Sequence, residues 1–166
     1  ILSQLLVIAL KGVPAFYLPA LLASDNDIKK FALTGERRDL NREKFDFDKL
    51  LIKLNDKDSN ASKNLMVLSR AMQIRAKVKA FHPAAEMKCL TKNRPDVVVI
   101  QRGEGSDSIF AIHNITDNRI DYSLRNSYLR NLSRNKLCFK DFLSGVEYTD
   151  LNFLLEPFQV LWIGLK

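Results

Sequence analysis

The side chains of this sequence that could do chemistry are concentrated in one charged stretch, residues 25–43. Acidic and basic groups follow one another closely there: Asp25, Asp27, Lys29, Lys30, Glu36, Arg37, Arg38, Asp39, Arg42 and Glu43. A carboxylate with basic neighbours has a lowered pKa and makes a poor general acid. We therefore expect no complete acid–base pair within the stretch. Its dense mixture of signs instead predicts an ordered network of ion pairs.

The elements before this stretch are typical of one step in a βα repeat. Residues 1–11 are apolar on nearly all sides, which indicates a helix buried on several faces. Gly12 ends that helix, and residues 13–18 predict a short buried strand. Residues 19–45 contain no clear element. Since the loop after a strand lies on the catalytic face of a βα barrel, a functional site is expected in this long loop.

Two further helices are predicted before residue 80. Residues 46–54 place four apolar side chains on one side, and residues 62–79 carry an apolar stripe at spacings of three and four. The run Phe81-His82-Pro83 ends the second helix, because proline disfavours the helical conformation of the residue before it.

After Pro83 the pattern changes to short strands separated by turns. The predicted strands cover residues 97–100, 109–115, 120–124, 137–142, 152–155 and 159–165, with turns at residues 104–107 and 114–119. Short strands at regular spacing are typical of an antiparallel sandwich. The predicted fold class is therefore α/β plus all-β, with the change of pattern near residue 80.

Composition argues against several classes of partner. The net charge is +7, but aromatic residues make up only 9% of the chain and do not interleave with the basic runs. We therefore expect solvated basic faces and no nucleic acid. No apolar run is long enough to span a membrane and no signal peptide is visible, so we expect no membrane partner. Cys89, Cys138 and His113 match no metal-ligand spacing, and His82 is expected to cap or pack. These features predict a cytoplasmic protein with reduced thiols and no cofactor.

Six runs are similar to segments from the C-terminal portion of sucrose-phosphorylase-type enzymes. These enzymes are glucosyl phosphorylases of the α-amylase superfamily, and they include sucrose phosphorylase and glucosylglycerate phosphorylase. The similar runs are residues 12–17, 21–27, 38–42, 81–83, 143–145 and 155–162. The most specific is Arg38-Asp39-Leu40-Asn41-Arg42, which matches a Gly-Arg-Asp-Ile-Asn-Arg type of run in the family. Residues 12–17 resemble the eighth barrel strand.

The resemblance implies a fold, an activity and a division of the chain. Residues 1–80 would be the end of a (β/α)8 barrel, with its last strand and helices, and residues 81–166 a C-terminal antiparallel β-sandwich. The parent would be a retaining glycosyltransferase that moves glucose from sucrose or a related α-glucoside to phosphate, giving α-glucose 1-phosphate. In the family the catalytic carboxylates come from barrel strands four, five and seven. We therefore expect none of them in this chain, expect the 166 residues alone to be inactive, and expect upstream barrel residues or another copy to cover the exposed strand.

The resemblance also assigns candidate binding residues. In the family, the first arginine of the motif lies at the floor of the donor subsite, where it binds hydroxyl groups of glucose. The matching residue is Arg38, with Arg37 as the alternative because the residues before the motif depart from the family pattern. A guanidinium group suits this role, since it offers five donors in a fixed fork. Asp25 and Asp27 are expected to order the loop or to line the substrate entrance.

Two other functions remain open. An α-amylase-type hydrolase would use water in place of phosphate as the acceptor. A stand-alone β-sandwich carbohydrate-binding module would need exposed aromatic side chains that stack on sugar rings. The aromatic residues after residue 81 lie mostly in apolar contexts that predict a core: Phe110, Tyr122, Tyr128, Phe139, Phe142, Tyr148, Phe153, Phe158 and Trp162.

Overall fold

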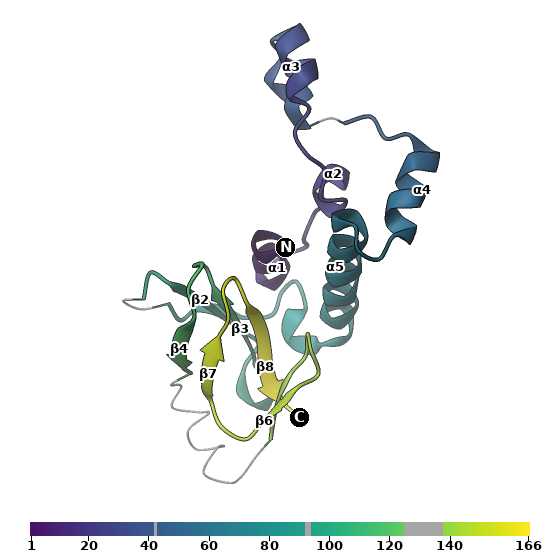
Figure 1. Cartoon of the computed structure of the whole chain (residues 1–166). Coiled ribbons are helices and arrows are strands. Elements are labelled where there is room, and N and C mark those ends of the chain that lie inside the picture. Colours follow the sequence, from purple (N-terminus) through teal and green to yellow (C-terminus); the bar gives the residue numbers. More distant parts are fainter. Residues whose placement is uncertain (42, 92–93, 125–137) are drawn as a thin grey trace. The chain divides into compact units, whose positions relative to one another are not determined.

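The computed structural model describes residues 1–41, 43–91, 94–124 and 138–166. The chain divides into two compact units. One comprises Ile1 with Ala15–Ser69, and the other comprises Leu2–Pro14 with Arg70–Lys166. We call them the helical unit and the β unit and describe each by itself (Figure 1).

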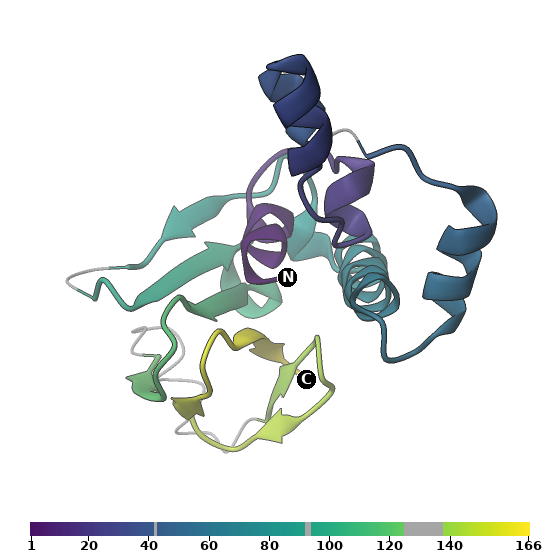
Figure 2. The ribbon, with the colours of Figure 1, turned by 45° about the horizontal axis from the view of Figure 1, so that its top comes forward.

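The β unit is built on antiparallel strands. Its larger sheet has six strands in the order β1-β2-β3-β8-β5-β6, and a smaller sheet pairs β4 with β7. The bounds are β1 Met87–Cys89, β2 Val97–Arg102, β3 Ile109–Asn114, β4 Ile120–Ser123, β5 Phe139–Asp141, β6 Glu147–Tyr148, β7 Asn152–Leu155 and β8 Val160–Leu165. β2 and β3 form a hairpin and run side by side in Figure 2. This arrangement is consistent with the predicted β-sandwich.

The hydrophobic core of the β unit takes residues from both sheets. Phe153 and Leu155 of β7 are buried while the residues between them are exposed, which is the pattern of a strand with one solvated face. All six residues of β3 are buried. Phe110 and Ile112 of this strand face the core, and helix α1 (Leu2–Ala9) also packs against β3. β3 is therefore the central strand of the unit.

Two buried arginines donate hydrogen bonds to the backbone at the C-terminal end of α1. The last carbonyl groups of a helix have no amide partner within the helix. The two guanidinium groups donate to these and neighbouring oxygens: Arg75 to Ile8, to Leu10 at 3.1 Å and to Gly12 at 2.5 Å, and Arg102 to Ala9 at 3.0 Å, to Leu10 at 2.5 Å and to His82 at 2.8 Å. Both also lie 5.8 Å from the centroid of the Phe81 ring, in cation–π contact. Burial lowers the pKa of both arginines.

The helical unit consists of short helices joined by turns. These are α2 Leu18–Leu21, α3 Ile28–Thr34, the 3-10 helix η1 Arg37–Asn41, α4 Phe47–Asn55 and the first part of α5 Asn60–Lys77. The predicted helices 46–54 and 62–79 are confirmed as α4 and α5. Asn64 on α5 is buried and donates to the carbonyl oxygens of Ala20 at 2.8 Å and Leu21 at 2.9 Å, which ties α2 to α5.

The strand predicted for residues 13–18 is not formed. Residues 13–17 have no regular secondary structure, and Leu18 begins α2. A strand needs a neighbouring strand for its backbone hydrogen bonds. Within the described part of the chain, no strand pairs with this segment, and Val13 is 81% exposed. The structure therefore contains no barrel strand in the described residues before residue 80.

The prediction that residues 19–45 hold no element is also wrong. The segment contains most of α2 and all of α3 and η1. Sequence reading overlooked a helix start signal at Asp27 and a stop signal at Gly35, which together delimit α3. β1 and β6 were missed as well, because strands of three and two residues carry too little pattern to be recognised.

The six predicted strands correspond to β2, β3, β4, β5, β7 and β8, with ends that agree within two residues. Leu137, the first residue of the predicted strand 137–142, lies outside the described residues, as does Arg42 of the arginine motif. The domain boundary expected after residue 80 stays a prediction, since the compact units divide after Ser69 and Leu2–Pro14 belongs with the strands.

Candidate functional site

The charged stretch forms an ordered structure in the helical unit. We call residues 27–41, which comprise Asp27, α3 and η1, the clasp. The Nζ atom of Lys30 lies 2.8 Å from Oδ1 of Asp39, and the two side chains are 34% and 14% exposed. The backbone amide of Asp27 donates to the carbonyl oxygen of Leu40 at 2.7 Å. These bonds tie the start of α3 to η1. The described structure thus shows one hydrogen-bonded ion pair within the stretch where a network was predicted.

Local sequence signals explain the shape of the clasp. The Asp27 carboxylate accepts from the Lys30 amide at 2.9 Å and so caps α3, whose first amides have no partner within the helix. Gly35 follows α3 with φ at 67°, a left-handed conformation that glycine adopts without steric cost. The chain then turns back, and η1 begins at Arg37.

Arg38 lies on η1 with its side chain 67% exposed. Its nearest ionic partner in the described structure is Glu36, with Nε 3.8 Å from Oε2. That distance is too long for a hydrogen bond. Asp39, the other neighbouring carboxylate, pairs with Lys30 instead. The guanidinium group of Arg38 therefore keeps most of its donors available to a ligand, and Arg37 beside it is also exposed.

Asp25 and Asp27 line a pocket of about 670 Å³ in the helical unit. Its wall combines carboxylates and lysines with a few apolar groups: Leu22, Ala23, Ser24, Asn26, Glu43, Lys44, Phe45, Asp46, Lys49, Leu50, Lys53, Ser59, Asn60 and Ala61. Arg38 is not among the lining residues. The structure thus brings Asp25 and Asp27 to one pocket and places Arg38 elsewhere on the same unit.

The carboxylates of this region are engaged in structural bonds. The hydrogen bond from Lys30, helped by Thr34, holds the pKa of Asp39 below its ordinary value, so this group is ionised at neutral pH. Glu43 accepts a hydrogen bond from the Ser24 hydroxyl. Asp27 caps α3. Asp39, with its lowered pKa, is therefore a poor proton donor at neutral pH, and all three side chains help to order the loop.

The described residues offer no metal site, since they hold no group of three His, Cys, Asp or Glu side chains able to bind an ion. Cys89 and Cys138 are free thiols. His82 is exposed, and its Nδ1 accepts from the Ala84 amide at 3.2 Å, which confirms its capping role.

None of the helices in the described ranges combines the length and the hydrophobicity that crossing a bilayer requires.

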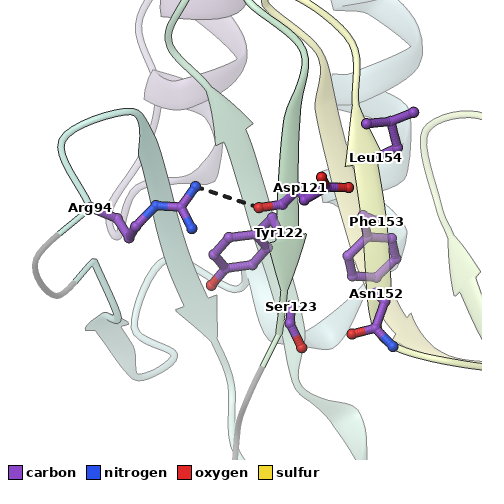
Figure 3. Close-up of a pocket in the computed structure, with 7 residues that line it drawn as sticks. All are labelled: Arg94, Asp121, Tyr122, Ser123, Asn152, Phe153 and Leu154. Carbon is purple, nitrogen blue, oxygen red and sulfur yellow. Dashed lines mark hydrogen bonds between the residues drawn. The ribbon is translucent and has the colours of Figure 1, made fainter.

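A second hollow of about 660 Å³ lies on the β4–β7 pair in the β unit (Figure 3). Arg94 reaches over it and donates to the carbonyl oxygen of Asp121 at 3.5 Å. The same guanidinium group makes two hydrogen bonds to Asp96, at 2.8 and 2.6 Å. Tyr122 and Phe153 form aromatic walls, but Phe153 is only 4% exposed. The hollow therefore lacks an open aromatic platform for a sugar ring.

The other aromatic side chains of the β unit also serve its core. Phe110, Phe139 and Trp162 are at most 1% exposed, which confirms the prediction that they are core residues. Phe158, at 55% exposed, is an exception. Tyr128 lies outside the described residues. A carbohydrate-binding module needs exposed rings, so the burial of these aromatics weighs against that alternative.

Comparison with curated proteins points to one family of enzymes. The chain is 30% identical to a glucosylglycerate phosphorylase from Allomeiothermus silvanus over 161 residues, which are 97% of this chain and 26% of that protein. It is 24% identical to the glucosylglycerate phosphorylases of Escherichia coli and Spirochaeta thermophila, over 98% and 97% of the chain. The resemblance to sucrose-phosphorylase-type glucosyl phosphorylases is confirmed. The chain spans about a quarter of the length of these phosphorylases. No family model matches it.

Comparison with solved structures shows a similar fold in two other proteins. AmyP in complex with maltose aligns with 99% of the chain at a TM-score of 0.68 and 16% identity, over 33% of its own length. Isomaltulose synthase from Erwinia rhapontici NX5 aligns with 99% of the chain at a TM-score of 0.70 and 13% identity, over 37% of its length. These neighbours are α-amylase-family proteins. At such low identity the likeness concerns the fold alone.

Sequence reading singled out Arg38, Asp25 and Asp27 but missed the role of Lys30. The sequence marks the two ends of α3, at Asp27 and Gly35, but carries no signal for the carboxylate that Lys30 reaches.

Proposed function

We propose that the chain is the C-terminal portion of a retaining α-glucosyl phosphorylase. The parent enzyme transfers glucose from sucrose or a related α-glucoside, such as a glucosylglycerate, to inorganic phosphate and releases α-glucose 1-phosphate. The similarity of 97% of the chain to glucosylglycerate phosphorylases supports this assignment. So does the α-amylase-family fold of the solved neighbours.

Within this proposal Arg38 binds the glucose unit of the donor. The observation that carries the assignment is the pairing of Asp39 with Lys30, which leaves the Arg38 guanidinium 67% exposed and without a close carboxylate partner. A planar group with several free donors can bind two neighbouring sugar hydroxyls at once. Arg37 is the alternative residue for the same role.

The bond-breaking groups come from the rest of the parent protein. A retaining mechanism needs a carboxylate nucleophile and a carboxylic acid about 5–5.5 Å apart. The nucleophile displaces the aglycone to form a β-glucosyl ester, and the acid protonates the leaving oxygen. Phosphate then attacks the anomeric carbon of this ester, breaks its bond to the carboxylate oxygen, and gives its proton to the conjugate base of the acid. Asp39, Glu43 and Asp27 are committed to the fold, so we propose that the isolated 166 residues are inactive.

The same proposal gives residues 13–17 a role. They form the last strand of a (β/α)8 barrel when upstream barrel residues supply a neighbouring strand, and another copy of the chain is the alternative cover. The exposure of Val13, at 81%, supports such a missing partner. Asp25 and Asp27 line the approach to the substrate through their pocket. The free thiols accord with a cytoplasmic enzyme.

The test of this function is product analysis with the full-length protein. Glucose 1-phosphate should form from an α-glucoside only when phosphate is supplied, and the isolated 166-residue chain should form none. Release of glucose at the same rate without phosphate would identify the hydrolase alternative. A panel of sucrose and glucosylglycerate as donors would then identify the aglycone.

The role of Arg38 is tested by substitution in the full-length protein. We expect Arg38→Ala to lower kcat/KM for the donor by about 10- to 100-fold, the value of a hydrogen-bonded charged group, while the affinity for phosphate changes little. Arg37→Ala is the matched control. If Arg37→Ala has the larger effect, the sugar is bound by Arg37, and wild-type rates in both variants would remove both residues from the site.

A further inference from the structure

Lys30 contacts both ends of the clasp through different atoms. Its backbone amide donates to the Asp27 carboxylate at the start of α3. Its side-chain Nζ donates to Asp39 on η1 at 2.8 Å. Asp27 closes the same loop through its amide, which donates to the Leu40 carbonyl oxygen. The position of η1 relative to α3 thus depends on bonds that meet at Lys30.

The element that carries Arg38 has little stability of its own. A 3-10 helix of five residues makes few hydrogen bonds, and their geometry is poorer than in an α-helix. The side chains of η1 that point to solvent cannot hold its orientation. Asp39 can, because its carboxylate is only 14% exposed and bonds to Lys30. Arg38 directly precedes Asp39 in the chain, so the orientation of its backbone depends on the anchor at Asp39.

The ion pair between Lys30 and Asp39 also determines whether Arg38 can pair with the Asp39 carboxylate. Without Lys30, the Asp39 carboxylate would lose its main hydrogen-bond donor. The guanidinium group nearest to Asp39 in the sequence is that of Arg38. It could then pair with the Asp39 carboxylate and would no longer be available to a ligand. An ion pair with one lysine therefore keeps a neighbouring arginine available.

We propose that Lys30 is a positioning residue for the donor site: it anchors Asp39 and so presents the Arg38 guanidinium to the glucose unit. This inference rests on the proposed function. Lys30 does not touch the sugar. It acts through Asp39, by fixing η1 and by competing with Arg38 for that carboxylate.

The experiment compares variants of the full-length protein in donor phosphorolysis. Because displacing a binding group by about 1 Å can cost up to 100-fold in rate, we expect Lys30→Met to lower kcat/KM for the donor by about tenfold or more. Lys30→Arg, which can still bond to Asp39, should recover most of the loss. Lys29→Met is the matched control, since it removes an exposed lysine at the next position and should leave kcat/KM within about twofold of wild type.

A double variant separates positioning from a general loss of structure. If Lys30 acts through Arg38, then Lys30→Met in an Arg38→Ala background should change kcat/KM by less than about twofold. A purely structural role would give multiplying losses instead. Asp39→Asn keeps the shape of the side chain and provides a second route to the same break, should Lys30→Met fold poorly. Hydrogen exchange at the Asp27 amide, which is bonded to Leu40, reports whether the clasp has opened.

The failures of the two proposals can be told apart. If Arg38→Ala retains wild-type activity, the assigned role of Arg38 is wrong. If Arg38→Ala is impaired but Lys30→Met and Asp39→Asn behave like Lys29→Met, the role of Arg38 stands and that of Lys30 is overturned. Full multiplication of the losses in the double variant would also overturn it.

Discussion

The two units of this chain use arginine in opposite ways. In the helical unit, Arg38 is 67% exposed and its neighbouring carboxylate is occupied by Lys30. In the β unit, Arg75 and Arg102 are 7% and 0% exposed and donate to backbone carbonyl oxygens at the end of α1. Both arrangements involve a guanidinium without a hydrogen-bonded carboxylate, yet the buried groups bond to the backbone while Arg38 is open to solvent.

The difference teaches how to separate a binding arginine from a structural one. A buried cation is costly unless its hydrogen bonds are satisfied. The carbonyl oxygens around Arg75 and Arg102 accept from most of these donors, although the Nε of Arg102 has no hydrogen-bond partner in the described structure. The ring of Phe81 adds a cation–π contact on each group. An exposed cation such as Arg38 is solvated by water and has no such requirement. Arg38 is a candidate for ligand binding because most of its donors are not bonded to other protein groups, and not simply because it is an arginine.

The largest expected effect is on stability, from Arg102→Met. The substitution removes the donor for three carbonyl oxygens, those of Ala9, Leu10 and His82. Leu10 and His82 keep other donors, Arg75 and the Ala85 amide, but a hydrogen bond from a charged group contributes about 1.5–3 kcal/mol, so we expect the free energy of unfolding to fall by about 3 kcal/mol. Urea unfolding followed by circular dichroism measures it.

An exposed arginine of the same unit provides the control. Arg119 is 66% exposed and pairs with Glu156 at 2.7 Å. Arg119→Met should cost less than about 1 kcal/mol, as is usual for surface ion pairs. Equal losses in the Arg102 and Arg119 variants would break the comparison, because burial would then not distinguish the two kinds of arginine.

A second expected effect is a loss of stability of the β unit at acidic pH. Burial lowers the pKa of His113 on β3 to about 4, from an ordinary value near 6.5. The unfolded chain therefore binds a proton between pH 6.5 and 4 that the folded chain does not bind. Stability is complete above pH 6.5 and falls as the pH is lowered through this window, by about 3 kcal/mol in total.

The measurement is a series of urea unfolding curves between pH 7 and pH 4. His113→Phe removes the titrating group and should flatten the slope relative to the wild-type chain. Other groups, such as Asp39, also lose favourable interactions in acid. The difference between the two proteins is thus the quantity to compare, and identical slopes would contradict the assignment to His113.

Sequence patterns predicted the β unit better than the helical unit, for a physical reason. The strands of the β unit bury alternate or continuous apolar residues, as in β7 and β3, so burial leaves a readable mark on the sequence. α4 and α5 were found in the same way. The segment 13–18 carries a similar apolar pattern but forms no strand here, because pairing depends on residues elsewhere and not on the pattern itself.

Only part of the candidate site could be predicted from the sequence. Its elements are short: α3 has seven residues and η1 has five, so an apolar pattern has too few positions to be recognised. The motif around Arg38 and the mixture of charges indicated a site and an ion-pair network. Which carboxylate pairs with which cation depends on the turn at Gly35, and that choice made Lys30 visible only in the structure.

The smallest effect sharpens the comparison with a matched pair of glycines, one from each unit. Gly35 and Gly105 have similar left-handed conformations, with φ at 67° and 61°, and a Cβ atom at either position would meet no atom within 4 Å. Alanine should therefore cost the same at both sites, about 1 kcal/mol from backbone strain alone.

The two substitutions should differ in their effect on donor turnover, although their costs in stability are the same. Gly35→Ala strains the turn that brings η1 back to α3, so it should reduce donor turnover in the full-length protein together with stability. Gly105→Ala strains the hairpin between β2 and β3 and should reduce stability alone. Gly35→Asn should restore turnover in part, because asparagine tolerates the left-handed conformation better than alanine. Equal loss of turnover from Gly35→Ala and Gly105→Ala would mean that the clasp has no special connection to the sugar site.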